Sequence, residues 1–200
     1  MKFAPVMSLS GPTFDRACAD LMRLVEADYA PTHIVGIRTG GLTVAHAMAA
    51  AASAEIPVLP LTCRRGTTGT KSRVPLLRSV LGALPRRMVD LLRQVEHRFI
   101  TAGQPQRGRR QEVDDTEVAA IAAHLGSQSG AARLLVADDA VDSGTTLSIV
   151  LRLLREVCPT GCEVRTAVIT QTLDSPIVRP DYRLYHRTLC RFPWSFDAAA

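Results

Sequence analysis

The feature that most constrains this chain is the alternation of short apolar runs with longer stretches of helical periodicity. Apolar residues recur at helical spacing between Phe14 and Val25, and the apolar run at 33–37 ends in a Gly-Gly loop. The same patterns predict further helices at 42–53, 116–125 and 145–157, and further strands at 56–61, 133–137, 164–170 and 182–184. Strands that alternate with helices predict an α/β fold, a mainly parallel sheet with helices on both faces.

One segment, at about 62–115, interrupts this alternation. Apolar residues keep helical spacing from 76 to 99, with Pro85 forcing a kink or break, and 104–111 is typical of a flexible loop. Two hundred residues are enough for one domain with an insertion of this size. We therefore predict a single domain over 1–200 with a helical, Arg-rich insertion at about 62–115.

Charge is concentrated in the same region. Residues 64–110 hold 12 of the 24 Lys and Arg residues and only two acids, so the segment is +10 within a chain of net charge +5. Three interpretations remain open. The segment could be a helical hairpin packed on the domain or on a dimer mate, a binding site for a phosphate-rich substrate or nucleotide, or a surface for RNA or DNA.

The rest of the composition indicates a cytoplasmic protein. No apolar run approaches the roughly 20 residues of a membrane span, and the N-terminus lacks the apolar core of a signal peptide. The cysteines are odd in number, five, and lack the spacing of a disulfide framework, which favours reduced thiols. Cys158 and Cys162 enclose a Pro-Thr-Gly turn, and we expect a helix end there and not a metal site.

The stretch Leu134-Leu-Val-Ala-Asp-Asp-Ala-Val-Asp-Ser-Gly-Thr-Thr-Leu147 carries the most chemical information. A buried strand delivers two adjacent acids to its end, and a turn rich in hydroxyls and glycine follows at the start of a helix. Such a turn is suited to a phosphate, because backbone N–H groups and hydroxyls can surround it. The neighbouring acids suit sugar hydroxyls or an accompanying cation. A sugar 5′-phosphate satisfies both requirements.

This stretch resembles the 5-phosphoribosyl-1-pyrophosphate (PRPP) signature of type I phosphoribosyltransferases. The resemblance implies the fold of that family, with a small C-terminal hood at about 180–197. It also implies that Asp138 and Asp139 hold the ribose hydroxyls and the metal, Mg²⁺. The 5′-phosphate would be wrapped by residues of the following loop: Ala140, Val141, Asp142, Ser143, Gly144, Thr145 and Thr146.

A second stretch, Ile34-Val-Gly-Ile-Arg-Thr-Gly-Gly41, resembles the pyrophosphate loop of the same family, which often contains a cis peptide. The glycines Gly40 and Gly41 allow the backbone to approach anionic oxygens closely. Arg38 supplies a permanent forked cation, and Thr39 lies between them. These residues are our further candidates for PRPP binding.

The C-terminus, with Tyr182-Arg-Leu-Tyr185 and Arg191-Phe-Pro-Trp194, resembles the close of short xanthine-guanine and hypoxanthine phosphoribosyltransferases. There an aromatic residue lies over the purine, which makes Trp194 and Phe192 candidates for base binding. Packing of Trp194 against a neighbouring helix is the alternative. The keto-reading Lys of those enzymes is absent, and Gln171 occupies its approximate position. An amide can read a keto or an amino group, so the base is left open.

Taken together, the resemblance implies an Mg²⁺-dependent enzyme that transfers phosphoribosyl from PRPP to a purine-type base and releases pyrophosphate. Asp142 lies where the family places an acid near the base, as proton acceptor or as an orienting group, and Asp138 and Asp139 complete the catalytic set. We expect a homodimer. Two alternatives remain: a PRPP-binding regulator that uses segment 64–110 on nucleic acid, and transfer to a non-purine acceptor.

Overall fold

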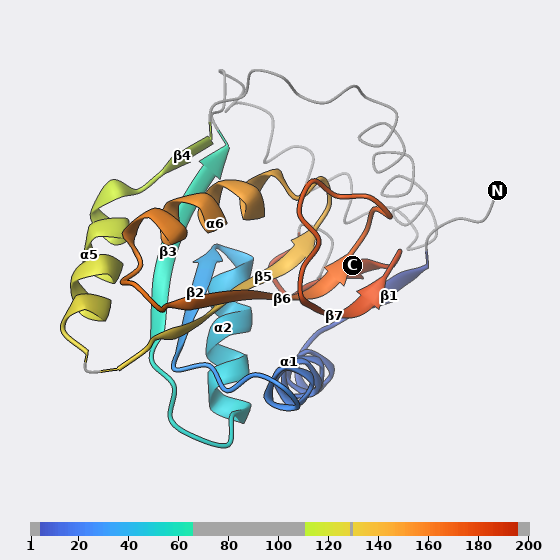
Figure 1. Ribbon diagram of the computed structural model, residues 1–200. Coiled ribbons are helices and arrows are strands. Elements are labelled where there is room, and N and C mark those ends of the chain that lie inside the picture. The colour runs from blue at the N-terminus through green and yellow to red at the C-terminus, as the bar shows by residue number, and fades with distance from the viewer. Residues whose placement is uncertain (1–4, 66–110, 129, 196–200) are drawn as a thin grey trace.

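A six-stranded sheet forms the centre of the structure and confirms the expected α/β fold (Figure 1). The computed structural model describes residues 5–65, 111–128 and 130–195. The helices and strands are, in chain order, β1 (Val6–Ser8), α1 (Pro12–Glu26), β2 (His33–Arg38), α2 (Gly40–Ala51), β3 (Val58–Arg65), β4 (Gln111–Val113), α5 (Asp115–Gly126), β5 (Arg133–Val141), α6 (Thr145–Val157), β6 (Glu163–Gln171), β7 (Tyr182–His186) and β8 (Leu189–Arg191).

The strand order of the main sheet is β4-β3-β2-β5-β6-β7. All its pairs are parallel except the antiparallel pair of β3 with β4. β1 and β8 form a separate parallel pair, which joins the N-terminal and C-terminal ends of the described chain. Parallel strands direct their carboxyl ends to one edge of the sheet, so the loops after β2 and β5 meet there.

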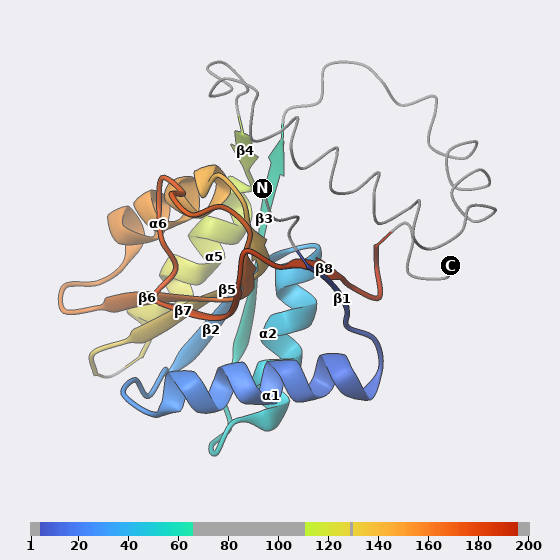
Figure 2. The same ribbon diagram turned by 90° about the vertical axis from the view of Figure 1, so that its right-hand side faces the viewer.

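Successive residues of the central strands serve two different cores. In β5, Leu135 and Ala137 pack in the core that includes residues of α1 and α2. Leu134 and Val136 pack instead in the core that includes residues of α5 and α6. Figure 2 shows the two helical layers on opposite faces of the sheet. A stretch of strand buried on both faces must be apolar throughout, which is why residues 134–137 of β5 form a continuous apolar run.

α1 and α6 each bury one stripe of apolar side chains against the sheet. α1 begins with Pro12 in its first turn, and its buried residues follow helical spacing: Phe14, Ala17, Cys18, Leu21, Met22 and Val25. In α6 the corresponding stripe is Leu147, Val150, Leu151 and Leu154. Each large apolar side chain fully removed from water contributes about 1.5–3 kcal/mol, so these stripes fix both helices against the sheet.

The elements differ from the sequence prediction mainly at their ends. β5 was expected to end at 137 but continues to Val141, because its pairing with β6 extends as far as the pair Val141–Gln171. Asp138 and Asp139 therefore lie within the strand. The sequence did not predict β1, β4 or β8, which are only three residues long. The expected helical stretch at 76–99 and the loop at 104–111 lie largely outside the described residues.

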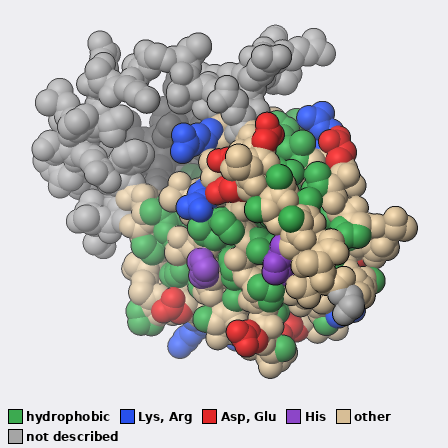
Figure 3. All heavy atoms as spheres, turned by 90° about the vertical axis from the view of Figure 1, so that its left-hand side faces the viewer, with side chains coloured by type: hydrophobic (Ala, Val, Ile, Leu, Met, Phe, Trp, Pro, Cys, Tyr) green, Lys and Arg blue, Asp and Glu red, His purple; other side chains and the backbone are tan. Residues whose placement is uncertain are grey.

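The described surface mixes charges of both signs. On the side of the molecule that carries α5 and β4, acidic and basic side chains lie interspersed (Figure 3). Outside residues 64–110 the sequence holds 17 acids and 12 basic residues, in keeping with this mixture. Of the helices in the described ranges, none has the length and apolar character that crossing a membrane requires.

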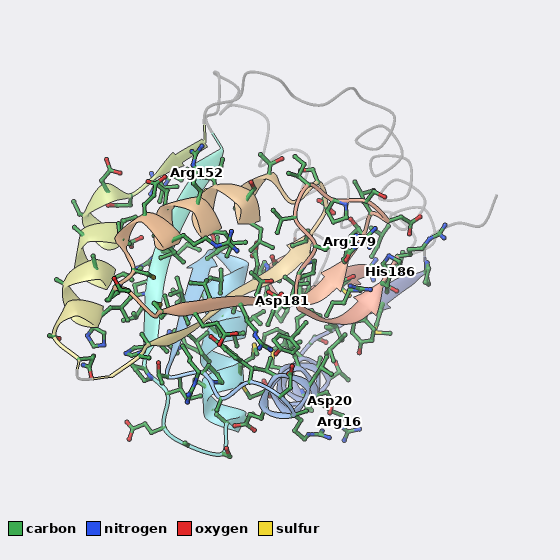
Figure 4. The ribbon with its side chains drawn as sticks, in the orientation of Figure 1. Arg16, Asp20, Arg152, Arg179, Asp181 and His186 are labelled. Atoms are coloured by element: carbon green, nitrogen blue, oxygen red, sulfur yellow. The ribbon has the colours of Figure 1, made fainter. Side chains whose placement is uncertain are left out.

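Polar side chains of β6 hold the neighbouring segments in place. Arg165 donates from Nη1 to Asp28 at 2.9 Å and to the Tyr182 hydroxyl at 2.6 Å, joining the end of α1 to β7. The Asp181 carboxylate accepts from the Thr166 N–H at 2.8 Å, and Figure 4 shows Asp181 beside β6. Arg16 and Asp20 of α1, by contrast, point outward from the sheet in the same view.

Two histidines meet at the opposite edge of the sheet from the loops after β2 and β5. His33, at the start of β2, is buried, and its Nε2 lies 3.2 Å from Nε2 of His124 in α5. Its Nδ1 lies 2.9 Å from the Thr32 hydroxyl. Burial, and secondarily the charge of His124, lowers the pKa of His33 below its ordinary value. The folded protein therefore disfavours a proton on His33.

This pair predicts a loss of stability in mild acid. The unfolded chain takes up a proton on His33 as the pH falls through about 6.5, whereas the folded chain resists it, so unfolding becomes more favourable there. We expect the melting temperature to fall between about pH 7.5 and pH 5.5, and to fall less in a His33→Gln variant. Thermal unfolding followed by circular dichroism across this range provides the test. His46→Gln, on the exposed surface of α2, is the control; an equal pH dependence in the His33→Gln variant would contradict the assignment.

Candidate active site

A cavity of about 300 Å³ lies at the carboxyl ends of β2 and β5. It is lined by Ile37–Gly40, Asp138–Leu147, Cys63 and Trp194. The two glycine-containing loops singled out in the sequence thus face one cavity, although about 100 residues separate them. The cavity also receives the first turns of α2 and α6, because these helices begin at Gly40 and Thr145.

The loop after β2 lies directly against β5. A Cβ atom on Gly41 would come within 2.5 Å of the Ala137 carbonyl oxygen and 2.8 Å of the Asp138 Cα, and both are backbone atoms. Gly41 is therefore buried behind the cavity wall and is not among the lining residues, whereas Arg38, Thr39 and Gly40 are. The Arg38–Thr39 peptide bond is cis, as in the family loop that this stretch resembles.

Arg38 lies at the cavity with an acidic partner that the sequence did not reveal. Its Nη2 lies 3.4 Å from Oε1 of Glu117, in the first turn of α5. The other carboxylate oxygen of Glu117 accepts the Thr62 N–H at 2.5 Å. The only sequence signal at Glu117 is its position three residues after the helix cap Asp114, which predicts a helix start and no partner.

The adjacent acids of β5 are half-buried and line the cavity. Oδ1 of Asp138 accepts the N–H of Asp139 at 2.9 Å, and Oδ1 of Asp139 accepts the N–H of Ala140 at 2.9 Å. Oδ2 of Asp139 accepts the indole N–H of Trp194 at 3.0 Å. A carboxylate has about four lone-pair sites, so these bonds orient the Asp139 carboxylate and leave it able to accept from a ligand.

The turn from β5 into α6 is held from the other side by the connection between β6 and β7. Gly144 has a φ of +77°, and a Cβ there would come within 2.8 Å of the Val178 backbone nitrogen. The Ile177 N–H donates to the Ser143 carbonyl at 2.8 Å. This connection was not predicted to contribute to the site, because its contacts are between backbone atoms and have no residue pattern.

The N-cap residues of the two helices at the cavity, Thr39 and Gly144, make no side-chain cap bond, whereas Asp114 caps α5. At α6 the neutral Ser143 hydroxyl accepts the Thr145 N–H in a long bond of 3.4 Å. An acidic cap would compete with an anionic ligand for the backbone N–H groups of the first turn. The first turns of α2 and α6 therefore direct the positive ends of two helix dipoles toward the cavity, which favours a bound anion.

The residues predicted to bind the base are not all at the cavity. Trp194 lines it, but Phe192 and Gln171 are buried and lie outside the lining. The Gln171 amide donates from Nε2 to the Leu173 carbonyl at 2.6 Å, and its Oε1 has no partner among the described residues. Asp142 lines the cavity and accepts a hydrogen bond from the Thr172 hydroxyl. Contact of Phe192 and Gln171 with a base stays a prediction.

No group of three or more His, Cys, Asp or Glu side chains within the described ranges could hold a metal ion by itself. Cys158 caps the end of α6 and Cys162 follows in the turn, as expected for a helix end. Asp138 and Asp139 could supply one or two carboxylates. That is the donor set with which Mg²⁺ binds when substrate phosphates provide the other oxygens.

The family model of the phosphoribosyl transferase domain matches residues 9–197. The chain belongs to this family. It is a phosphoribosyltransferase, an enzyme that transfers phosphoribosyl from PRPP, and the cavity that both glycine-containing loops line is its candidate active site.

Solved structures share the fold. A purine phosphoribosyltransferase from Pyrococcus horikoshii OT3 is 17% identical, with 95% of this chain and 94% of that chain covered and a TM-score of 0.58. The xanthine-guanine-hypoxanthine phosphoribosyltransferase of Helicobacter pylori is 18% identical, with 96% of this chain and 95% of that chain covered and a TM-score of 0.60. A hypothetical protein from Neisseria gonorrhoeae with bound ppGpp is 15% identical, with 97% and 91% covered and a TM-score of 0.60. No curated protein matches this sequence.

The contact of Gly41 with β5 predicts a sharp effect of a single methyl group. In Gly41→Ala the Cβ would meet backbone atoms of Ala137 and Asp138, which cannot rotate away, so the loop after β2 must shift. We expect phosphoribosyl transfer to fall by at least about 100-fold, because small misplacements at a reacting site cost that much. Steady-state kinetics measure the loss. Gly126→Ala, at the end of α5 with no atom within 4 Å of the added Cβ, is the control and keeps its activity; undiminished transfer in Gly41→Ala would refute the role.

Proposed function

We propose that this enzyme transfers phosphoribosyl from PRPP to a ring nitrogen of a purine-type base, giving a nucleoside 5′-monophosphate and pyrophosphate. The observation that carries the proposal is the meeting of the Arg38–Gly41 loop, the acids of β5 and the first turn of α6 around one cavity. PRPP needs these three kinds of group, for its pyrophosphate, its ribose hydroxyls and its 5′-phosphate.

The 5′-phosphate would bind in the turn Asp142–Thr146. The backbone N–H groups and hydroxyls of this turn surround the start of α6, where the helix dipole favours an anion. The pyrophosphate would bind at Arg38, Thr39 and Gly40, with Gly41 behind them. A guanidinium suits this role because it stays charged and donates to two oxygens at once.

Asp138 and Asp139 would accept hydrogen bonds from the ribose hydroxyls and hold Mg²⁺ together with oxygens of the substrate. The metal, when bound, neutralises charge on the departing pyrophosphate. The protein itself supplies orientation and electrostatics, since the base nitrogen displaces pyrophosphate from C1 of the ribose without a covalent intermediate on the enzyme.

The acceptor would lie between Asp142 and Trp194, the predicted base-side residues that line the cavity. Asp142, oriented by the Thr172 hydroxyl, would accept the proton of the attacking ring or hold the base in place. Trp194 would offer ring surface, which flat bases bind with about 1–3 kcal/mol per base. The names of the purine enzymes with this fold support a purine-type acceptor.

A panel of acceptors tests the proposal directly. With PRPP and Mg²⁺, we expect pyrophosphate release with at least one of hypoxanthine, guanine, xanthine and adenine, and no release after chelation of the metal with EDTA. A coupled pyrophosphate assay provides the measurement. Release with non-purine acceptors alone would replace the purine assignment, and PRPP binding without any release would favour the PRPP-binding regulator, which would then be tested for nucleic-acid binding through residues 64–110.

The acids of β5 are tested by isosteric replacement. Asp138→Asn and Asp139→Asn retain the shape of each side chain but remove the charge that would hold hydroxyls and metal. We expect each to lower kcat/KM by about 100-fold or more, as the loss of a charged group at a reacting site does. Glu55→Gln, an exposed acid beyond α2, is the control. Near-native turnover in both Asn variants would reject their assignment.

A further inference from the structure

We propose that Trp194 is a positioning residue for Asp139: its indole N–H holds the carboxylate in the orientation that binds the ribose of PRPP. The inference rests on the proposed function. It assigns to Trp194 a role toward PRPP, in addition to the ring surface offered to the acceptor. The bond joins two segments 55 residues apart, the end of β5 and the turn after β8.

The hydrogen bond has an ordinary length and only one possible direction. Trp194 Nε1 lies 3.0 Å from Oδ2 of Asp139, and an indole nitrogen can only donate. The second oxygen, Oδ1, accepts the Ala140 N–H at 2.9 Å. With each oxygen accepting one bond, the carboxylate plane is fixed, and a lone pair on each oxygen remains for a ligand at the cavity that Asp139 lines.

The indole is itself held rigidly. Its ring is stacked on Phe192 with centroids 5.1 Å apart and an interplanar angle of 0°, and it meets Phe14 edge-on at 5.5 Å. Both phenylalanines are buried, and Phe14 belongs to α1. Aromatic packing of this kind restrains a donor far better than a long flexible side chain does. The C-terminal turn thus acts as a fixed support for Asp139.

The pyrophosphate loop is fitted to the same bond. A Cβ on Gly40 would lie 2.2 Å from Oδ2 of Asp139 and 2.8 Å from Nε1 of Trp194, so the glycine backbone packs directly over the hydrogen bond. Three segments of the chain, which would contact the pyrophosphate, the ribose and the acceptor, meet at this point. Loss of the indole N–H would therefore change the orientation of the Asp139 carboxylate more directly than it would change the binding of the acceptor.

Trp194→Phe separates the two roles, because it keeps an aromatic ring beside Phe192 and removes the N–H donor together with the five-membered ring that carries it. We expect the Kd of PRPP with Mg²⁺, measured by calorimetry, and its KM to rise about tenfold, as for the loss of a hydrogen bond to a charged group. The KM of the acceptor should stay within about twofold if its ring contact is retained. Tyr29→Phe, which removes a hydroxyl that donates to the Leu134 carbonyl at the other end of β5, is the control and should bind PRPP within about twofold of the native protein. Melting temperatures verify that both variants fold.

Trp194 is the only tryptophan in the chain, so its indole N–H gives one resolved signal in ¹⁵N–¹H spectra. We expect Asp139→Asn to move this signal upfield by removing the charged acceptor, and PRPP to shift it saturably in the native protein. An unchanged signal in Asp139→Asn, or native PRPP affinity in Trp194→Phe, would overturn the inference while leaving the proposed function intact. A rise in the acceptor KM alone would also overturn it. If the native protein binds no PRPP at all, the proposed function fails and this inference fails with it.

Discussion

The contact between the Gly41 backbone and the end of β5 determines where the rest of the site lies. A methyl group at this glycine would overlap the Ala137 carbonyl and the Asp138 Cα, so the two segments touch without any side chain between them. The parallel pairing of β2 with β5, which ends at Gly36 and Ala137, brings the strands to this point side by side. Both loops that follow must then surround the same space, and the first turns of α2 and α6 face it together.

In the proposed function the site would hold anions without a general positive field. Outside residues 64–110 the sequence is net acidic, and the cavity is lined by three carboxylates, of Asp138, Asp139 and Asp142. Arg38, the cation at the cavity, is itself paired with Glu117. The groups that would favour a phosphate in the proposed function are therefore local: helix N-termini without an acidic cap, hydroxyls and one oriented guanidinium. Pairing with Glu117 costs little attraction at this half-exposed position, and it directs the guanidinium.

The sequence predicts those parts of the molecule that have a local pattern. Helix periodicity located α6 at its observed bounds, and the apolar runs located β2 and β5, because burial on both faces demands them. The two loops that line the cavity were found through their glycines, acids and hydroxyls. Contacts made across the fold left no such pattern. Glu117 is an ordinary helix-start acid in the sequence, and the Ile177 N–H that supports Ser143 could belong to any residue type. The three-residue strands β1 and β8 likewise exist only through their pairing with each other, which a local sequence pattern does not reveal.

The polar residues at the end of β6 show why the acceptor side was harder to predict. Thr170 donates to the Thr188 carbonyl at 2.7 Å, Gln171 donates to the Leu173 carbonyl at 2.6 Å, and Thr172 donates to Asp142. These side chains hold the connection to β7 and the turn before β8, which carries the chain toward Trp194. An amide suits this task better than a lysine, because it forms a neutral hydrogen bond while fully buried, where an ammonium would pay a large desolvation cost. The absence of the expected lysine is thus consistent with a structural use of Gln171, and in the proposed function recognition of the acceptor would fall to groups that line the cavity, Asp142 and Trp194.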